Sequence, residues 1–242
     1  MKILAFLCAL LATAAVLAGA CSTQGGEEPQ VGKLQRESKS LDPKNAQSVR
    51  AQLKMGAGEL NLTGGADQLM EGDFSYNVAD WKPEVSYDVS GDEGELLVKQ
   101  GGSKGSNLGD EARNEWDIRL NDQVPINIDV QLGAGESDLD LDSLTLEGLK
   151  LQMGAGKTTV DLTGDYAQSF EASIQGGVGE ATVELPSEVG VKAKAQGGLG
   201  RINAEGLKRV GDSYVNDAYG ESDVTINVDV KGGVGEINLE VV

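Results

Sequence analysis

The sequence has no histidine, and aromatic residues make up only 4% of its 242 positions. Histidine is the commonest general base and the commonest protein ligand for metals. Its absence excludes Ser-His-Asp and Cys-His catalytic sites and His-rich zinc sites. The few aromatic rings leave little surface on which bases could stack, and the formal net charge of -19 repels a phosphate backbone. We therefore expect no nucleic-acid partner.

Cysteine is almost as scarce, since Cys8 and Cys21 are the only two. Cys8 lies in residues 1–20, where Lys2 precedes an apolar run that ends at Leu17. Such a segment is typical of a secretory signal peptide, and the run is too short to span a bilayer comfortably. Its removal leaves Cys21 alone, so no intramolecular disulfide is expected even in an oxidising compartment.

The residues around Cys21 read Leu-Ala-Gly-Ala-Cys, which resembles the lipobox of bacterial lipoproteins. That resemblance implies that Cys21 is acylated and anchors an extracytoplasmic protein to the cell membrane. Ala18 stands where the pattern usually has leucine. The alternative is a secreted protein with one free cysteine. The polar residues that follow show no period that could bury a core, so residues 21–47 are predicted to be a lipid anchor and flexible tether, with the alternative that the last part of the segment joins the fold.

Much of the glycine falls in a repeated motif, Gly-x-Gly, flanked by similar residues. Examples are "KMGAGELNL" from Lys54, "QMGAGKTTVDL" from Gln152 and "KGGVGEINLEV" from Lys231. Six copies are clear, and "SGDEGELLV", with Gly94 in the key place, is a degraded seventh candidate. In the central run the second glycines are 21, 23 and 21 residues apart. A fixed period of this length is typical of a solenoid.

One copy, "MGAGKTTVDL", also resembles the end of a nucleotide-binding loop. That loop requires a first glycine five residues before Gly156, where this chain has Leu151, and it must open a helix. The residues after Lys157 instead alternate as in a strand. The other five copies have Glu or Arg in place of Lys157. We therefore expect no nucleotide and no other cofactor.

Apolar and polar residues alternate on both sides of each glycine pair, as in Leu149, Leu151 and Met153 before it and Val160 and Leu162 after it. A period of two predicts strands with one buried face. A coil of about 21 residues at about 3.3 Å per residue suits a right-handed parallel β-solenoid-like stack with Gly-x-Gly corners. The less favoured alternative is an antiparallel sandwich. The predicted corner glycines are Gly56, Gly58, Gly133, Gly135, Gly154, Gly156, Gly177, Gly179, Gly198, Gly200, Gly233 and Gly235.

Stacking the copies in chain order aligns two rows of charge. The residue after the second glycine alternates in sign, and we call this row the charge ladder: Glu136, Lys157, Glu180, Arg201 and Glu236. Each basic residue would then lie between two acidic ones, which stabilises slightly. Five residues after the same glycine comes the acid row: Asp140, Asp161, Glu184, Glu205 and Glu240. It is interpreted as a solvated face, with weak binding of divalent cations as the alternative.

Residues 38–77 and 81–100 resemble the N-terminal domain of bacterial toast-rack proteins, and the repeats that follow resemble the C-terminal repeat domain of the same family. That domain type also occurs in LiaF-like envelope-stress proteins, which have membrane helices where this chain has a lipobox. The resemblance implies a stacked-strand fold outside the cell without enzymatic activity. It places an N-terminal toast-rack domain at 48–125 and a repeat domain at 126–242.

These observations favour a lipid-anchored envelope protein with a structural, adhesive or sensing role. Its expected partners are the membrane, through the lipid, and an unidentified envelope or surface protein. The alternative is a β-helix enzyme that acts on polysaccharides. Clustered acids beside a basic residue would be needed for that chemistry, and the best candidates are Asp138, Asp140, Asp161 and Lys157.

Overall fold

The computed structural model describes residues 30–102 and 111–242. These residues form strands and one short 3-10 turn, and the all-β prediction is confirmed. The elements are β1 (Val31–Leu41), β2 (Ser48–Thr63), β3 (Met70–Val78), η1 (Ala79–Trp81), β4 (Pro83–Ser90), β5 (Glu93–Gln100), β6 (Asn114–Leu120), β7 (Ile126–Asp140), β8 (Leu146–Asp161), β9 (Phe170–Leu185), β10 (Gly190–Glu205), β11 (Lys208–Val210), β12 (Ser213–Val215) and β13 (Thr225–Val241).

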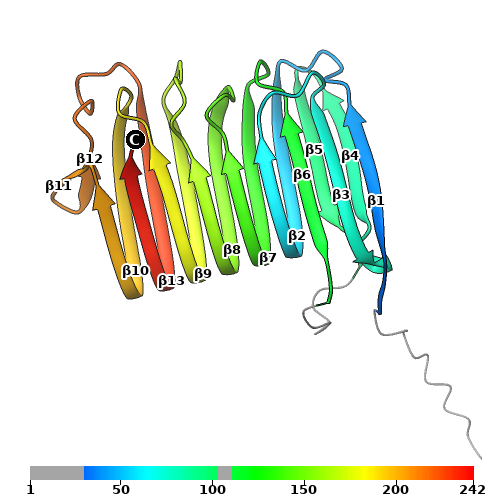
Figure 1. Cartoon of the computed structure of the whole chain (residues 1–242). Helices are drawn as coiled ribbons and strands as arrows, with labels where there is room; N and C mark the ends of the chain where they lie inside the picture. Colours follow the sequence, from blue (N-terminus) through cyan, green and yellow to red (C-terminus); the bar gives the residue numbers. More distant parts are fainter. Residues whose placement is uncertain (1–29, 103–110) are drawn as a thin grey trace, which may run out of the picture.

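Six strands, β2, β7, β8, β9, β10 and β13, are 15 to 17 residues long and bend at their Gly-x-Gly motif. Residues before the motif form a first arm, and residues after it form a second arm. In β2 the first arm, 48–54, pairs in parallel with β5, whereas the second arm, 59–63, pairs in parallel with β6. The arms therefore belong to two layers. In Figure 1 the bends lie along one edge, the corner edge, and the connecting loops lie along the opposite loop edge.

The alternating apolar residues of both arms point between the layers. Leu149 and Leu151 on the first arm of β8 and Val160 on its second arm are each at most 3% exposed. Together with their equivalents in the other coils they form one continuous hydrophobic core. The predicted inward faces are thus confirmed, and the polar residues between them face solvent.

The coils do not stack in chain order. The order is β2-β7-β8-β9-β13-β10, so the last strand of the chain lies between two earlier ones. Gly235 is in register with Gly179 on one side and with Gly200 on the other. The sequential stack predicted for the last two copies is therefore wrong.

The inward side chains explain this order. Val230 and Leu239 of β13 are almost fully buried, whereas their partners in β10 are Ala195 and Ala204, which are only partly buried. Large apolar side chains gain most from a neighbour on both sides, because more of their surface leaves water. The bulkier coil therefore lies inside the stack, and the alanine-rich coil forms its end.

At the other end, both layers are extended by strands that are first parallel to β2 (β5 and β6) and then antiparallel to their neighbours (β4, β3 and β1). β6, β3 and β1 follow β2 in the second layer, and β5 and β4 follow it in the first. Strand β1 corrects the predicted tether, because residues 31–41 belong to the sheet. Most of its side chains are exposed, so this edge strand is held mainly by its backbone pairing with β3 and has no apolar alternation to reveal it.

Gly94 is not a corner, which corrects the seventh repeat. It pairs with Val49 in the first arm, and a Cβ there would lie 2.6 Å from the hydroxyl of Tyr87. The glycine therefore makes room for an aromatic ring. Beside the first true corner lies Gln100, whose Oε1 accepts a hydrogen bond of 2.8 Å from the Gly56 amide. The Gln100 side chain thus bonds to the backbone of this corner on the side where, among the described residues, no further coil is stacked.

At the distal end the hairpin of β11 and β12 covers part of β10, with Lys192 and Ala193 paired to β12. The buried side chain of Asn216, which follows β12, is hydrogen-bonded to the loop between β9 and β10. Its Nδ2 donates to the carbonyls of Pro186 and Val189, at 2.9 and 2.7 Å. Within the described residues, the second arm of β10 has no strand on its outer side.

Candidate functional site

The corner edge is built from glycines that meet one another across the stack. Gly156 has φ +134°, and a Cβ on it would lie 1.8 Å from the carbonyl oxygen of Gly135 in the next coil. The first glycines are also confined, since a Cβ on Gly154 would lie 2.3 Å from the Gly133 oxygen. All twelve predicted corner glycines lie at these bends. Only glycine allows backbones to approach this closely.

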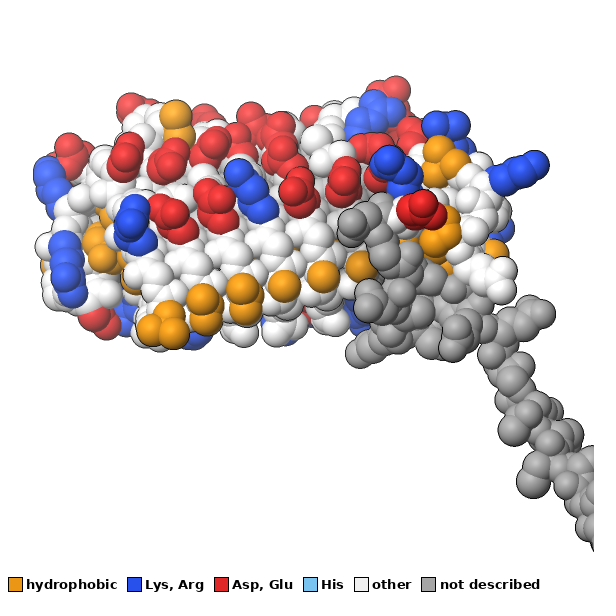
Figure 2. Space-filling model, turned by 60° about the horizontal axis from the view of Figure 1, so that its bottom comes forward, with side chains coloured by type: hydrophobic (Ala, Val, Ile, Leu, Met, Phe, Trp, Pro, Cys, Tyr) orange, Lys and Arg blue, Asp and Glu red, His pale blue; other side chains and the backbone are white. Residues whose placement is uncertain are grey.

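The residue between the two glycines points away from the molecule at every bend. These residues form a single row of apolar side chains along the corner edge (Figure 2). In stack order they are Ala57, Ala134, Ala155, Val178, Val234 and Leu199. These residues can be found in the sequence as the middle residue of each motif, but only the stacking of the coils makes them neighbours.

The charge ladder is correct for Lys157 and wrong beyond Glu180. Lys157 lies between Glu136 and Glu180, and its Nζ is 3.8 Å from Glu180 Oε2. Because β13 is inserted, Glu236 is adjacent to Glu180. Arg201 is in register with Glu236 and is one coil further from Glu180. Two like charges therefore lie side by side where alternation was predicted.

Two amides relieve this repulsion. Asn238 Nδ2 donates to Glu180 Oε1 at 3.2 Å, and Asn203 Nδ2 donates to Glu236 Oε1 at 2.6 Å. Hydrogen bonds to a charged acceptor are stronger than neutral ones. Neither asparagine stands out in the sequence, although each lies two residues after the ladder residue of its own coil.

Lys157→Glu would place a carboxylate directly between those of Glu136 and Glu180, in a row that Glu59 and Glu236 continue on either side. We expect it to lower the free energy of unfolding by about 0.5 to 1 kcal/mol, an effect that shrinks as salt is added, because the side chains are largely exposed. Thermal unfolding in low and high salt measures this. Lys157→Arg is the control and should be nearly neutral. An equal loss in the arginine variant would show that charge is not what matters at this position.

The acid row lies on the second arms, near the loop edge. Its members are consecutive in the stack, in the order Asp140, Asp161, Glu184, Glu240, Glu205. Burial, reinforced by the neighbouring carboxylates, raises the pKa of Asp140 and of Glu184. Within residues 30–102 and 111–242 no three Asp, Glu or Cys side chains are grouped closely enough to hold a metal ion.

The candidate catalytic set is only partly brought together. Asp140 and Asp161 are direct neighbours, whereas Asp138 pairs with Thr159 one step nearer the corner. Lys157 lies further along the same arm, where its salt-bridge partner is Glu180. Asp140 and Asp161 therefore belong to the acid row and Lys157 to the charge ladder, whereas Asp138 belongs to neither.

The raised pKa values make the acid row a source of pH-dependent stability. A carboxyl whose pKa is higher in the folded chain than in the unfolded chain favours folding at low pH, and this contribution is lost as pH rises through the raised value. We therefore expect Asp140→Asn to melt at a higher temperature than the parent at pH 7. The difference should vanish below about pH 4, where both states are protonated. A lower melting temperature at pH 7 would contradict this account.

Comparison with known proteins identifies the fold. Residues 30–184 match the family model for the N-terminal domain of toast-rack proteins. The chain belongs to the toast-rack family. The match extends past residue 125, where the sequence analysis placed a domain boundary, and the pairing of β2 with β7 continues the stack across it.

One solved structure is closely similar over its whole length. It is a proposed cell adhesion protein of Clostridium sporogenes, 41% identical, with a TM-score of 0.85 over 87% of this chain and 100% of that one. A proposed adhesin of Parabacteroides merdae is 13% identical over 88% of this chain and 98% of that one, with a TM-score of 0.30. No curated protein matches the chain.

Two further points concern the membrane. Cys21, the predicted lipidation site, lies outside the described residues. In the part of the chain that the structure describes, no helix has the length and apolar character needed to cross a bilayer.

Proposed function

We propose that this toast-rack protein is a lipid-anchored surface protein that mediates adhesion without catalysis. The observation that carries the proposal is the relative with 41% identity and a TM-score of 0.85, which is itself a proposed cell adhesion protein. A stack of coils suits such a role, because it repeats the same side chain at each strand spacing of about 4.8 Å and so displays long rows to a partner. Anchoring by Cys21 would hold these rows at the cell surface.

Cys21→Ser tests the anchor. The parent should be found in the membrane fraction, and the variant should be released, because acyl chains supply the membrane affinity of a lipoprotein. Immunoblots of the membrane and soluble fractions measure this. If the variant stays with the membrane and leaves it only in detergent, the lipid on Cys21 is not the anchor.

Adhesion needs its own assay. Beads that carry the mature chain should be retained on intact cell envelopes, and beads that carry the same chain after heat denaturation should not. Equal retention of the two would contradict an adhesive role for the folded surface. Incubation with neutral and acidic polysaccharides addresses the enzyme alternative: cleavage that Asp161→Asn abolishes would support catalysis over adhesion.

A further inference from the structure

The apolar row on the corner edge changes in size along the stack. It has alanine in the three coils β2, β7 and β8, and larger residues in the next three. Val178, Val234 and Leu199 are 56%, 47% and 73% exposed. We call these three residues the apolar tip. Three coils make the same bend with alanine at this position, so the bend does not require a larger side chain. The exposure of valine and leucine to water therefore needs another explanation.

The inward residues next to the corner become smaller along the stack, whereas the exposed ones become larger. Two residues before the exposed position, the first three coils have buried Met55, Leu132 and Met153, and the three coils of the apolar tip have glycine. A Cβ on Gly176, the first of these glycines, would have no atom within 4 Å. A hollow of about 30 Å³ lies there, with the apolar tip among its lining residues. Compared with the first three coils, these three coils therefore have a smaller residue inside the stack and a larger apolar residue on its surface.

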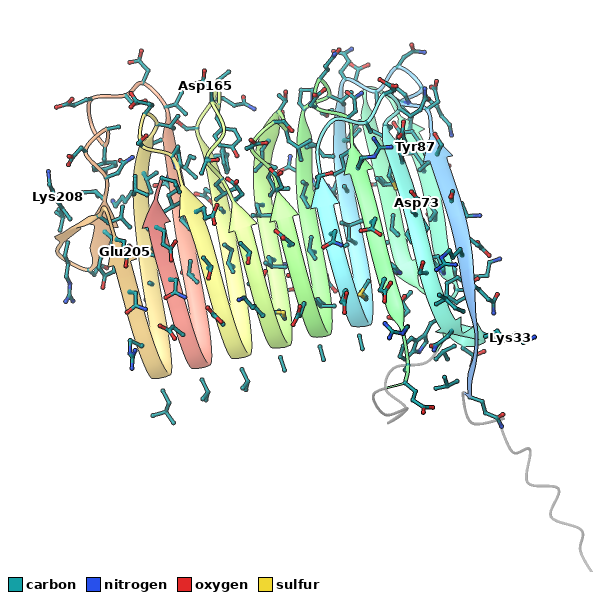
Figure 3. The ribbon with its side chains drawn as sticks, in the orientation of Figure 1. Lys33, Asp73, Tyr87, Asp165, Glu205 and Lys208 are labelled. Atoms are coloured by element: carbon teal, nitrogen blue, oxygen red, sulfur yellow. The ribbon has the colours of Figure 1, made fainter. Side chains whose placement is uncertain are left out.

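The corner edge is also the edge at which β1, the first described strand, begins. Val31, at the start of β1, is opposite Val78, and Tyr76 is opposite Asn114 in the next strand. Asn114 Nδ2 donates to the carbonyl of Ala57, which is a corner residue, at 2.9 Å. β1 therefore begins at the corner edge, as Figure 1 shows. In Figure 3, Lys33 lies at this edge, and Asp165 lies at the loop edge.

The coil that carries Leu199 has several basic side chains. Residues 190–215 contain five basic and two acidic side chains, and two of the basic ones, Lys194 and Lys208, are ion-paired with Asp212 and Asp217. Arg201 follows Leu199 by two residues and is exposed. Lys192 and Lys194 are on the first arm of the same strand. Apolar side chains with basic neighbours are the combination that favours the interface of a lipid bilayer.

We propose that the apolar tip rests in the headgroup region of the bilayer to which the N-terminal lipid is anchored, with Arg201 against lipid phosphates. This inference rests on the proposed anchoring. Three side chains alone would bind a membrane weakly, but the tether holds them close to it and raises their effective concentration. The molecule then lies with its corner edge on the membrane, attached at both ends of the stack. The loop edge and its acid row face outward.

The test supplies the anchor artificially, so it does not depend on acylation. The mature chain with Cys21→Ser is held by an N-terminal His tag on nickel-chelating phosphatidylcholine vesicles. An environment-sensitive fluorophore is attached to the single cysteine of Val178→Cys, or of Asp165→Cys as the control. We expect a blue shift and quenching by nitroxide-labelled lipids at position 178 and neither at position 165. With Val234→Ser and Leu199→Ser added, the shift at 178 should be lost.

Two results would overturn the proposal. One is a probe at 178 that behaves on vesicles like the probe at 165. The other is a blue shift at 178 that appears without vesicles as protein concentration rises, since the tip would then contact a second copy. Thermal unfolding of each labelled variant verifies that it is folded. If the probe inserts but Cys21→Ser stays with the membrane in cells, the anchor assignment fails and the tip assignment stands.

Discussion

Gly156→Val should lower the melting temperature by about 10 °C, which corresponds to about 4 kcal/mol for a domain of this size. The new Cβ would lie 1.8 Å from the carbonyl oxygen of Gly135, and that atom belongs to backbone held on both sides. The φ of +134° is also a conformation that residues with a Cβ avoid, at a cost of about 1 to 3 kcal/mol. Displacing the adjacent coil adds a similar amount. Circular dichroism during heating measures the sum.

Ala155→Val is the matched control. It adds the same side chain one position earlier, where Val178 and Val234 already occur at the equivalent bends. The control should melt close to the parent. A small effect of Gly156→Val, or an equal effect of both substitutions, would mean that the corners do not have the register described.

Deletion of residues 225–242 should abolish cooperative folding of the distal half. The deletion removes β13, which pairs over 15 positions with β9 and over 15 with β10. Five of its inward side chains, Ile226, Val228, Val230, Ile237 and Leu239, are at most 4% exposed. Burial of such side chains stabilises by about 1.5 to 3 kcal/mol each, so the loss is on the order of 10 kcal/mol, comparable with the whole stability of a domain.

Removal of Val242 alone, which is 69% exposed, is the control and should be neutral. Limited proteolysis and thermal unfolding compare the two truncations. If the chain ending at 224 melted like the parent, β13 would have to be a dispensable outer coil, as the sequential stack supposed.

The corners and the buried rows could be predicted from sequence, because both depend on residues close together in the chain. Gly156 can be recognised as a corner because it has the same place in every copy of the motif. The burial of Leu151 and Val160 follows from the alternation of apolar and polar residues. The exposed row around Val178 is visible in the same motif once the bend is known.

The order of the coils could not be predicted in this way. β9, β13 and β10 share one pattern, so every order among them aligns glycine with glycine. The signals that distinguish them are weak: Ala195 and Ala204 in place of larger residues, and the spacing of 35 residues from Gly200 to Gly235. The error in the charge ladder follows directly from this ambiguity. β1 was missed for a different reason, since an edge strand held by backbone hydrogen bonds needs no apolar pattern.

The insertion of β13 determines which residues are neighbours in every row, and paired cysteines test it most directly. Cys8 and Cys21 are the only native cysteines, so a mature chain with Cys21→Ser accepts pairs without interference. Residues in register on adjacent strands are about 4.8 Å apart, within the range of a disulfide, whereas residues two strands apart are not. Glu180→Cys with Glu236→Cys should cross-link on mild oxidation, and Glu180→Cys with Arg201→Cys should not. The reverse result would place β10 directly against β9 and contradict the fold described.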